Sequence, residues 1–256
     1  MSKLTEKLNK LTQDDSKPFG FTASVSKSIL PRMLTIARIK FDIEANTIPE
    51  IDTDAVLLSV DVTSKAIDFI KKINKEKLPA IWGIEAASIS RKEADQLIKI
   101  GCDYIVLKLT SPSPVLASDE KLAKIIKINP SINDTMIRAI NLLPVDTVFI
   151  EDDSEAPDIM IERLMIYSSI AAMVEQPLLL SVSLKLAKDT FEAIRDIGVT
   201  GLILDWSSPA SNKKIAEIKD VIQSLPEKKR NSRKRGHASL PSIPGASYDE
   251  DNDFEK

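Results

Sequence analysis

Short apolar segments alternate with longer, mixed segments along most of the chain. The clearest apolar segment is residues 104–107, Tyr-Ile-Val-Leu, which is apolar on both faces of an extended backbone. Runs of this kind are typical of parallel strands that are covered on both sides. Gly101 and Gly198 each precede such a segment, and glycine suits the left-handed position that ends a helix. The pattern therefore predicts repeated helix-to-strand units.

Two kinds of apolar segment take turns along the chain. One kind follows a helix end and an acidic or threonine residue, and the other opens on a proline, as at Pro31, Pro79 and Pro177. Proline is tolerated at the first residue of a strand. Together the two kinds predict eight strands, at residues 34–38, 55–60, 80–85, 104–107, 124–129, 147–151, 177–183 and 201–205.

The spacing of these strands is similar to that of the (β/α)₈, or TIM-barrel, superfamily over residues 30–225, without a match to one family within it. A pair of segments recurs about every 45–50 residues, as expected of two βα units in a barrel of about 250 residues. The resemblance implies a closed parallel sheet surrounded by helices. Helices are expected at residues 64–75, 90–101, 119–123, 131–142, 157–175, 187–197 and 211–225.

Two further helical features bear on how the barrel is covered. Residues 2–12 place Leu4, Leu8 and Leu11 on one face. This helix is expected to plug the bottom of the barrel or to pack beside it, and a frayed amphipathic terminus is an equal alternative. The helix at 157–175 is nearly apolar between Met165 and Met173. It must be covered on more than one side, either by a neighbouring segment, which we favour, or by another subunit of a homo-oligomer.

Composition divides the chain into two parts. Residues 1–225 form the predicted barrel domain with its N-terminal helix, and residues 226–256 form a predicted disordered tail, basic at 228–235 and acidic at 249–253. The net charge of −3 predicts no general attraction to nucleic acid. The basic block predicts weak attraction to phosphate backbones at most, and the favoured interpretation is a solvated tail.

Cysteine content and hydropathy indicate a compartment. The single cysteine, Cys102, excludes an internal disulfide and is expected to be a small core residue. The chain lacks the apolar core of a signal peptide, and no apolar run approaches the ~18 residues of a membrane span. We therefore expect a cytoplasmic protein with no membrane partner.

Polar residues mark the carboxyl ends of the strands, where barrels of this kind carry their active sites. They are Arg38, Ser59, Asp61, Glu85, Lys108, Lys127, Asn129, Glu151, Ser181, Ser183 and Asp205. Side chains alternate between the two faces of a strand, so Glu85 shares a face with Ile81, and Asp205 with Ile203. If these faces point into the lumen, carboxylates and amines meet at the mouth of the barrel.

Several chemistries are excluded by what the sequence lacks. The only histidine, His237, is in the tail, so the barrel has no imidazole for acid–base catalysis or metal binding. The turns after strands seven and eight contain no glycine, which argues against a phosphate-bearing or flavin cofactor. A divalent metal held by Asp61, Glu85, Glu151 or Asp205 is chemically possible, but the spacing of these carboxylates forms no metal-binding motif. We therefore predict neither a cofactor nor a metal.

The remaining candidates are lysines and carboxylates. Lys108 or Lys127 would serve as nucleophile or electrostatic partner, with Glu85, Glu151 and Asp205 to move protons. This resembles class I aldolases in kind, although those commonly carry the lysine on strand six, where this chain has Val-Phe-Ile at 148–150.

Two functions stay open at this point. The first is a lyase or isomerase that acts on a small, polar, carbonyl-containing metabolite. The second is a barrel without chemistry, with its charges paired as a plug, which serves as a binding or assembly module through its tail and its apolar sixth helix. Fold alone does not decide between the two.

Overall fold

The computed structural model describes residues 1–13, 32–40, 50–60, 63–72, 80–117, 119–152 and 158–226. The predicted tail beyond Pro226 and the strand-end residue Asp61 lie outside these residues.

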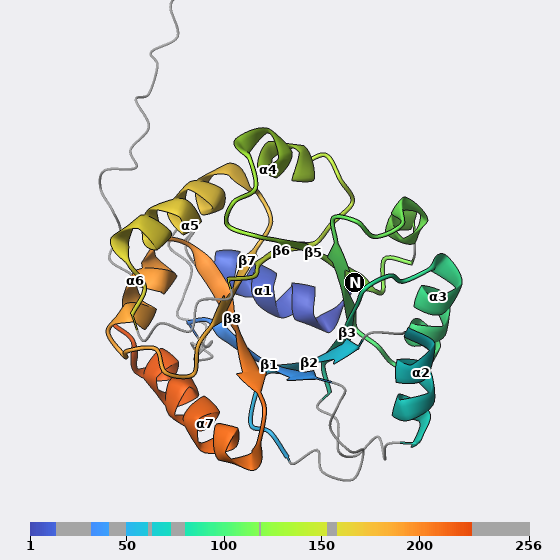
Figure 1. Cartoon of the computed structure of the whole chain (residues 1–256), viewed down its shortest axis with the longest axis horizontal. Helices are drawn as coiled ribbons and strands as arrows, with labels where there is room; N and C mark the ends of the chain where they lie inside the picture. The colour runs from blue at the N-terminus through green and yellow to red at the C-terminus, as the bar shows by residue number, and fades with distance from the viewer. Residues whose placement is uncertain are drawn as a thin grey trace, which may run out of the picture. The chain divides into compact units, whose positions relative to one another are not determined.

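Eight parallel strands close into a barrel in which each strand pairs with its neighbours in sequence and β1 pairs with β8 (Figure 1). The strands are β1 (Leu34–Lys40), β2 (Ala55–Val60), β3 (Trp82–Ala86), β4 (Tyr104–Lys108), β5 (Ala123–Ile128), β6 (Thr147–Ile150), β7 (Leu178–Val182) and β8 (Val199–Trp206). The predicted (β/α)₈ barrel is therefore confirmed, and all eight strands lie where the apolar segments place them.

Helices surround the sheet between most of the strands (Figure 1). The helices are α1 (Lys3–Gln13), α2 (Thr63–Lys72), α3 (Arg91–Lys99), a 3-10 helix (Ser113–Ala117), α4 (Asp134–Ile140), α5 (Ile161–Met173), α6 (Thr190–Asp196) and α7 (Pro209–Ser224). No helix in the described part of the chain is long and apolar enough to cross a membrane.

Local signals account for the helix ends. Ser90 and Glu93 form the predicted capping box of α3, and Asn133 accepts a hydrogen bond from the first turn of α4. Gly101 and Gly198 have φ values of 92° and 108°, in the left-handed region expected after a helix. Helix and strand boundaries are thus set largely by side chains and glycines next to them in sequence.

The helix predicted at 119–123 is wrong. The helical turn between β4 and β5 is instead the 3-10 helix after Pro112, and Ala123 already belongs to β5. Asp119 is part of a tight turn, because its carboxylate and its carbonyl accept the N–H groups of Lys121 and Leu122. Asx turns of this kind compete with helix formation.

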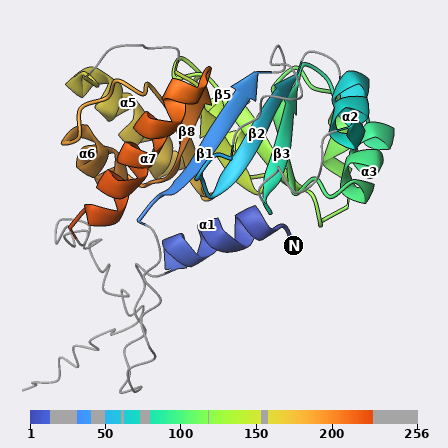
Figure 2. The same cartoon turned by 90° about the horizontal axis from the view of Figure 1, so that it is seen from below.

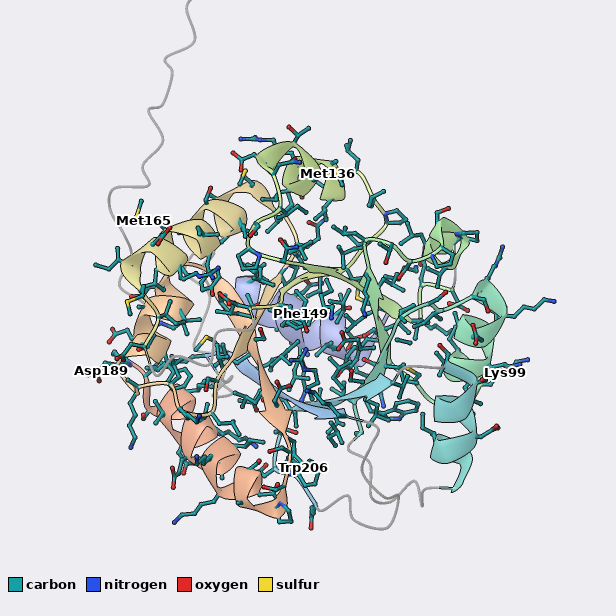
Figure 3. All side chains as sticks on the ribbon, viewed as in Figure 1. Lys99, Met136, Phe149, Met165, Asp189 and Trp206 are labelled. Atoms are coloured by element: carbon teal, nitrogen blue, oxygen red, sulfur yellow. The ribbon has the colours of Figure 1, made fainter. Side chains whose placement is uncertain are left out.

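Helix α1 closes the amino-terminal end of the barrel (Figure 2). Leu4 and Leu8 are buried in the same apolar cluster as Phe149, which points into the lumen and is labelled at the centre of Figure 3. The carboxylate of Asp103 accepts hydrogen bonds from the Ser2 hydroxyl and from the N–H groups of Lys3 and Leu4, at 2.7–2.9 Å. Of the expected placements of this helix, the plug at the bottom of the barrel is confirmed.

Helix α5 is less covered than expected. Tyr167 and Ile170 are buried, but Ile161 and Met165 are 77% and 67% exposed. Met165 is labelled on α5 in Figure 3. The favoured prediction, that this helix is covered within its own chain, is wrong for its outer face. Cys102, by contrast, is buried as predicted, and burial raises the pKa of its thiol.

Candidate active site

Five charged side chains meet in the lumen at the carboxyl end of the barrel, and we call them the mouth cluster. They are Arg38 on β1, Glu85 on β3, Lys127 on β5, Glu151 just after β6 and Asp205 on β8. Arg38, Lys127, Glu151 and Asp205 each lie two positions beyond a residue of the inner apolar cluster, for example Ile36 below Arg38. Glu85 lies four positions beyond Ile81, which belongs to the same cluster. The alternation of side chains therefore carries all five inward.

Arg38 is the centre of the mouth cluster. Its Nε and Nη2 donate to the two carboxylate oxygens of Asp205 at 2.5 and 3.0 Å, and these residues are also direct partners in the β1–β8 register. Its Nη1 donates to Glu151 Oε1 at 2.5 Å. The two-pronged contact is the geometry that makes an arginine–carboxylate pair strong and specific.

Lys127 completes a ring of charges. Its ammonium bonds to Oε1 of Glu85 and lies 2.7 Å from Oε2 of Glu151. Glu151 thus bridges Lys127 and Arg38. Glu85 closes the ring less tightly, because its Oε2 is buried, lies 3.8 Å from Arg38 Nη1 and has no hydrogen-bond partner among the described residues.

Exposure increases across the cluster from Glu85 to Asp205. Glu85 is 4% exposed, whereas the side chains of Glu151 and Asp205 are 25% and 53% exposed. Two cations and three carboxylates leave one net negative charge. The buried end holds a carboxylate–lysine pair, and the solvent end offers carboxylate oxygens.

The charged forms of the cluster residues support one another. Burial opposes the charge on Lys127, but hydrogen bonds to Glu151 and Glu85 outweigh it and raise the pKa of the amine above 10.5. Burial likewise opposes the charge on Glu151, but hydrogen bonds from Lys127 and Arg38 hold the pKa of this carboxyl below 4.5. At neutral pH the cluster therefore contains an ammonium and a carboxylate in contact.

The structure unites four of the five predicted site residues and leaves out one. Glu85, Lys127, Glu151 and Asp205 belong to the mouth cluster, whereas Lys108 is exposed and its side chain forms no hydrogen bond or ion pair with another described residue. Lys108 pairs in register with Lys127, which already binds the nearby carboxylates. Its side chain therefore has solvent as its partner at the rim.

Arg38 is the site residue that sequence reasoning passed over. It stands at the end of the first strand, but no role was assigned to it. The available signal was its position two residues after Ile36 on the lumen face. Its partners lie 113 and 167 residues away in sequence, so only closure of the barrel brings them together.

Ser181 fixes the chain where β6 ends. Its hydroxyl accepts the N–H of Asp152 at 2.7 Å and lies 3.1 Å from the carbonyl of the same residue. The carboxylate of Asp152 accepts the hydroxyl hydrogen of Tyr167 and lies 3.5 Å from Arg163. A hollow of about 100 Å³ opens beside these residues, between β7 and the start of α5. Glu151 therefore belongs to the mouth cluster, whereas Asp152 lines this hollow.

Metal binding finds no support in the described residues. No group of three or more histidine, cysteine, aspartate or glutamate side chains there is arranged to hold a metal ion. The three carboxylates of the mouth cluster are instead directed at Arg38 and Lys127.

Comparison with known proteins agrees with the fold. Solved structures similar to this chain include tryptophan synthase alpha-subunits of the hyperthermophile Pyrococcus furiosus. One substituted subunit gives a TM-score of 0.58 at 10% identity and covers 74% of this chain and 96% of its own. Another gives 0.57 at 12% identity and covers 75% and 97%. The tryptophan synthase α2β2 complex from the same organism gives 0.56 at 12% identity, with coverage of 74% and 96%.

At such low identity the likeness shows the barrel fold alone. No protein-family model matches the sequence, and no curated protein matches it significantly. The function has to be argued from the mouth cluster.

Proposed function

We propose that this barrel is an enzyme of the lyase or isomerase type, which moves a proton on a small, polar, carbonyl-containing compound at the mouth cluster. Glu151 or Asp205 accepts a proton from the carbon next to the carbonyl group. The electron pair of the broken C–H bond moves to the carbonyl oxygen, and Lys127 stabilises the negative charge that develops there.

The contact between Lys127 and Glu151 carries this proposal. An ammonium and a carboxylate 2.7 Å apart at the carboxyl end of a barrel place a fixed positive charge beside a proton acceptor. An ammonium has three N–H donors, and Glu85 and Glu151 take two of them. The third donor has no partner among the described residues, and we propose that it binds a substrate oxygen.

The desolvation free energy of the buried charges in the mouth cluster also supports a functional role. Buried ion pairs lose much of their attraction to desolvation, and well-packed apolar side chains in their place are often neutral or stabilising by about 1–4 kcal/mol. A layer of charges in the lumen is therefore an expensive way to close a barrel. Groups with shifted pKa values are also concentrated at functional sites.

The raised pKa of Lys127 favours the electrostatic role over the nucleophilic one. A lysine that forms a Schiff base needs an amine with a lowered pKa, as in an apolar pocket or beside another cation. Lys127 has two carboxylates instead. Lys108, at the rim, is proposed to attract the polar end of the substrate.

Solvent-exchange NMR tests the proposal. The full chain is incubated in D₂O with a panel of small keto acids and hydroxyketones, and deuterium is followed at the carbon next to the carbonyl. We expect exchange above background for at least one compound, and a loss of about 10²–10⁴-fold for Glu151→Gln and for Lys127→Met. Glu217→Gln, at an exposed position on α7, is the control and retains full exchange.

A second candidate function is a binding or assembly module without chemistry. It is favoured by the completeness of the pairing, because Arg38 and Lys127 each already contact carboxylates. The variant Arg38→Met/Glu85→Leu/Lys127→Met/Glu151→Leu/Asp205→Asn separates the two, because it leaves no charge of the mouth cluster unpaired. If it folds with equal or greater stability and wild-type exchange is absent for every compound, the cluster is a structural plug and the enzyme proposal fails.

A further inference from the structure

The outer face of α5 is apolar or small except at Glu162, in its first turn. Its exposed residues are Ile161, Glu162, Met165, Ser168, Ser169 and Ala172. Between Arg163 and Glu175 the chain carries no charged side chain. Exposed helix faces in soluble proteins are usually charged, so this face has the composition of a helix that packs against another element.

Bulky and small residues are segregated on this face. Ile161 and Met165 occupy the amino-terminal half, and Ser168, Ser169 and Ala172 occupy the carboxyl-terminal half. When two such helices lie antiparallel, the bulky half of each covers the small half of the other. Small residues let the two backbones approach closely, so the face is complementary to itself.

A second apolar group lies at the carboxyl end of α5. Asn141, at the end of α4, donates to the carbonyl of Met173 at 2.9 Å and accepts the N–H of Glu175 at 3.2 Å. Leu142 and Leu143 follow directly and are 87% and 40% exposed. On one copy these leucines are separated from Ile161 by the length of α5.

We propose that α5 forms an antiparallel, two-fold symmetric interface with α5 of a second copy of this chain. The axis passes through the middle of the helix, near Met165 and Ser168. This arrangement brings Leu142 and Leu143 of one copy onto Met160 and Ile161 of the other, so that both exposed apolar groups are covered at once. An isologous contact requires this kind of self-complementary surface.

Area and charge both fit a second copy. A standard interface buries about 800 Å² per partner, and five exposed apolar side chains with the small-residue surface between them are of that order. The face carries no charge from residue 164 to residue 174, so symmetry places no like charges in contact at its centre, and the exposed Glu162 and Glu175 lie toward its two ends. The paired charges of the mouth cluster lie in the lumen, and this interface is independent of the function proposed for them.

Molar mass by light scattering over a concentration series tests the interface with the full chain. We expect the mass to rise from monomer to dimer across the micromolar range. Met165→Lys is expected to weaken dimerisation about tenfold or more. Leu109→Lys makes a similar change at a residue that is 47% exposed at the end of β4, and it leaves dimerisation unchanged. A monomer at every concentration overturns the proposal, as does an equal effect of the two variants.

A cross-linking experiment fixes the geometry. Ser168→Cys places a thiol near the proposed axis, and Ser224→Cys places one at an exposed serine at the end of α7. The native Cys102 is buried and does not compete. Under mild oxidation we expect a disulfide-linked dimer for Ser168→Cys at several times the rate for Ser224→Cys. Equal rates indicate random collision and overturn the antiparallel arrangement.

Discussion

Arg38 on β1 binds Asp205 on β8 through two parallel hydrogen bonds, although 167 residues separate them in sequence. The two residues are direct partners in the register that closes the barrel. One contact thus joins the first strand to the last and also anchors the mouth cluster. The pairing of β1 with β8 that closes the sheet therefore also brings together Arg38 and Asp205 of the candidate site.

Loss of Arg38 is expected to be strongly destabilising. Arg38→Met leaves Glu85, Glu151 and Asp205 with Lys127 as their remaining cation in the cluster. Removal of one partner from a buried charge network costs about 3–5 kcal/mol, because the remaining charges stay desolvated. Urea unfolding measures the change. Arg138→Met, at an exposed arginine on α4, is the control and is expected to cost less than about 1 kcal/mol. Equal losses for the two variants contradict the network.

The stability of the fold is expected to have a plateau bounded by the titration of Glu151 and Lys127. The pKa of Glu151 is lowered, so its contribution is present above pH 4.5 and is lost as the pH falls through the folded-state pKa. The pKa of Lys127 is raised, so its contribution is present below pH 10.5 and is lost as the pH rises through the folded-state pKa. Urea midpoints measured from below pH 4.5 to above pH 10.5 provide the measurement. Glu151→Gln should flatten the acid limb selectively, and Lys127→Met the alkaline limb.

The alternation of side chains made much of this site predictable. Glu85 and Asp205 point into the lumen as the period of two requires, and Ile81 and Ile203 share their faces in the inner apolar cluster. Short apolar segments and two left-handed glycines were enough to locate eight strands. These features depend on residues that are close together in sequence.

Three features that the sequence left undetermined depend on distant contacts. Arg38 binds Glu151, just after β6, and Asp205 on β8. Only the stagger of the closed sheet determines which strand ends meet. Lys108 was grouped with Lys127, but the two cations are neighbours in register and the shared carboxylates bind Lys127. The exposure of α5 was missed because apolar composition does not distinguish burial within a chain from burial between chains.

Asp103 is expected to stabilise the barrel through α1. Its carboxylate accepts three hydrogen bonds from Ser2, Lys3 and Leu4, as an N-terminal capping residue would. Asp103→Ala should therefore lower the free energy of unfolding by about 1–2 kcal/mol. Hydrogen exchange should also become faster in α1 before it changes in β1. Asp220→Ala, at an exposed position on α7, should leave both unchanged. Unaltered exchange in α1 of the Asp103 variant would mean that the helix is held by Leu4 and Leu8 alone.

Gly83 is expected to be more sensitive to substitution than Gly101. A Cβ at Gly83 would collide with the ring of Tyr104 and would lie 2.5 Å from its carbonyl oxygen. Tyr104 is fully buried, and its hydroxyl donates to the carbonyl of Val56 at 2.7 Å, so the ring has little freedom to move. Gly83→Ala should cost about 1–3 kcal/mol or more. A Cβ at Gly101 would have no neighbouring atom within 4 Å. Gly101→Ala is therefore expected to lower the free energy of unfolding only through the positive φ, by about 1–2 kcal/mol. Thermal unfolding of both variants gives the order, and the reverse order would contradict this packing.

Borohydride trapping is expected to separate an electrostatic lysine from a nucleophilic one. The raised pKa of Lys127 keeps its amine protonated at neutral pH, and an ammonium does not attack a carbonyl group. When the full chain is treated with keto acids and borohydride, peptide mass spectrometry should find no selective adduct at Lys127. Lys108 should react no faster than Lys213, an exposed lysine on α7. A stoichiometric adduct at Lys127 would require its amine to be neutral, and therefore a different arrangement of Glu85 and Glu151 around it when substrate binds. In that case Glu85→Gln should speed the trapping, because it removes one of the two carboxylates that favour the ammonium.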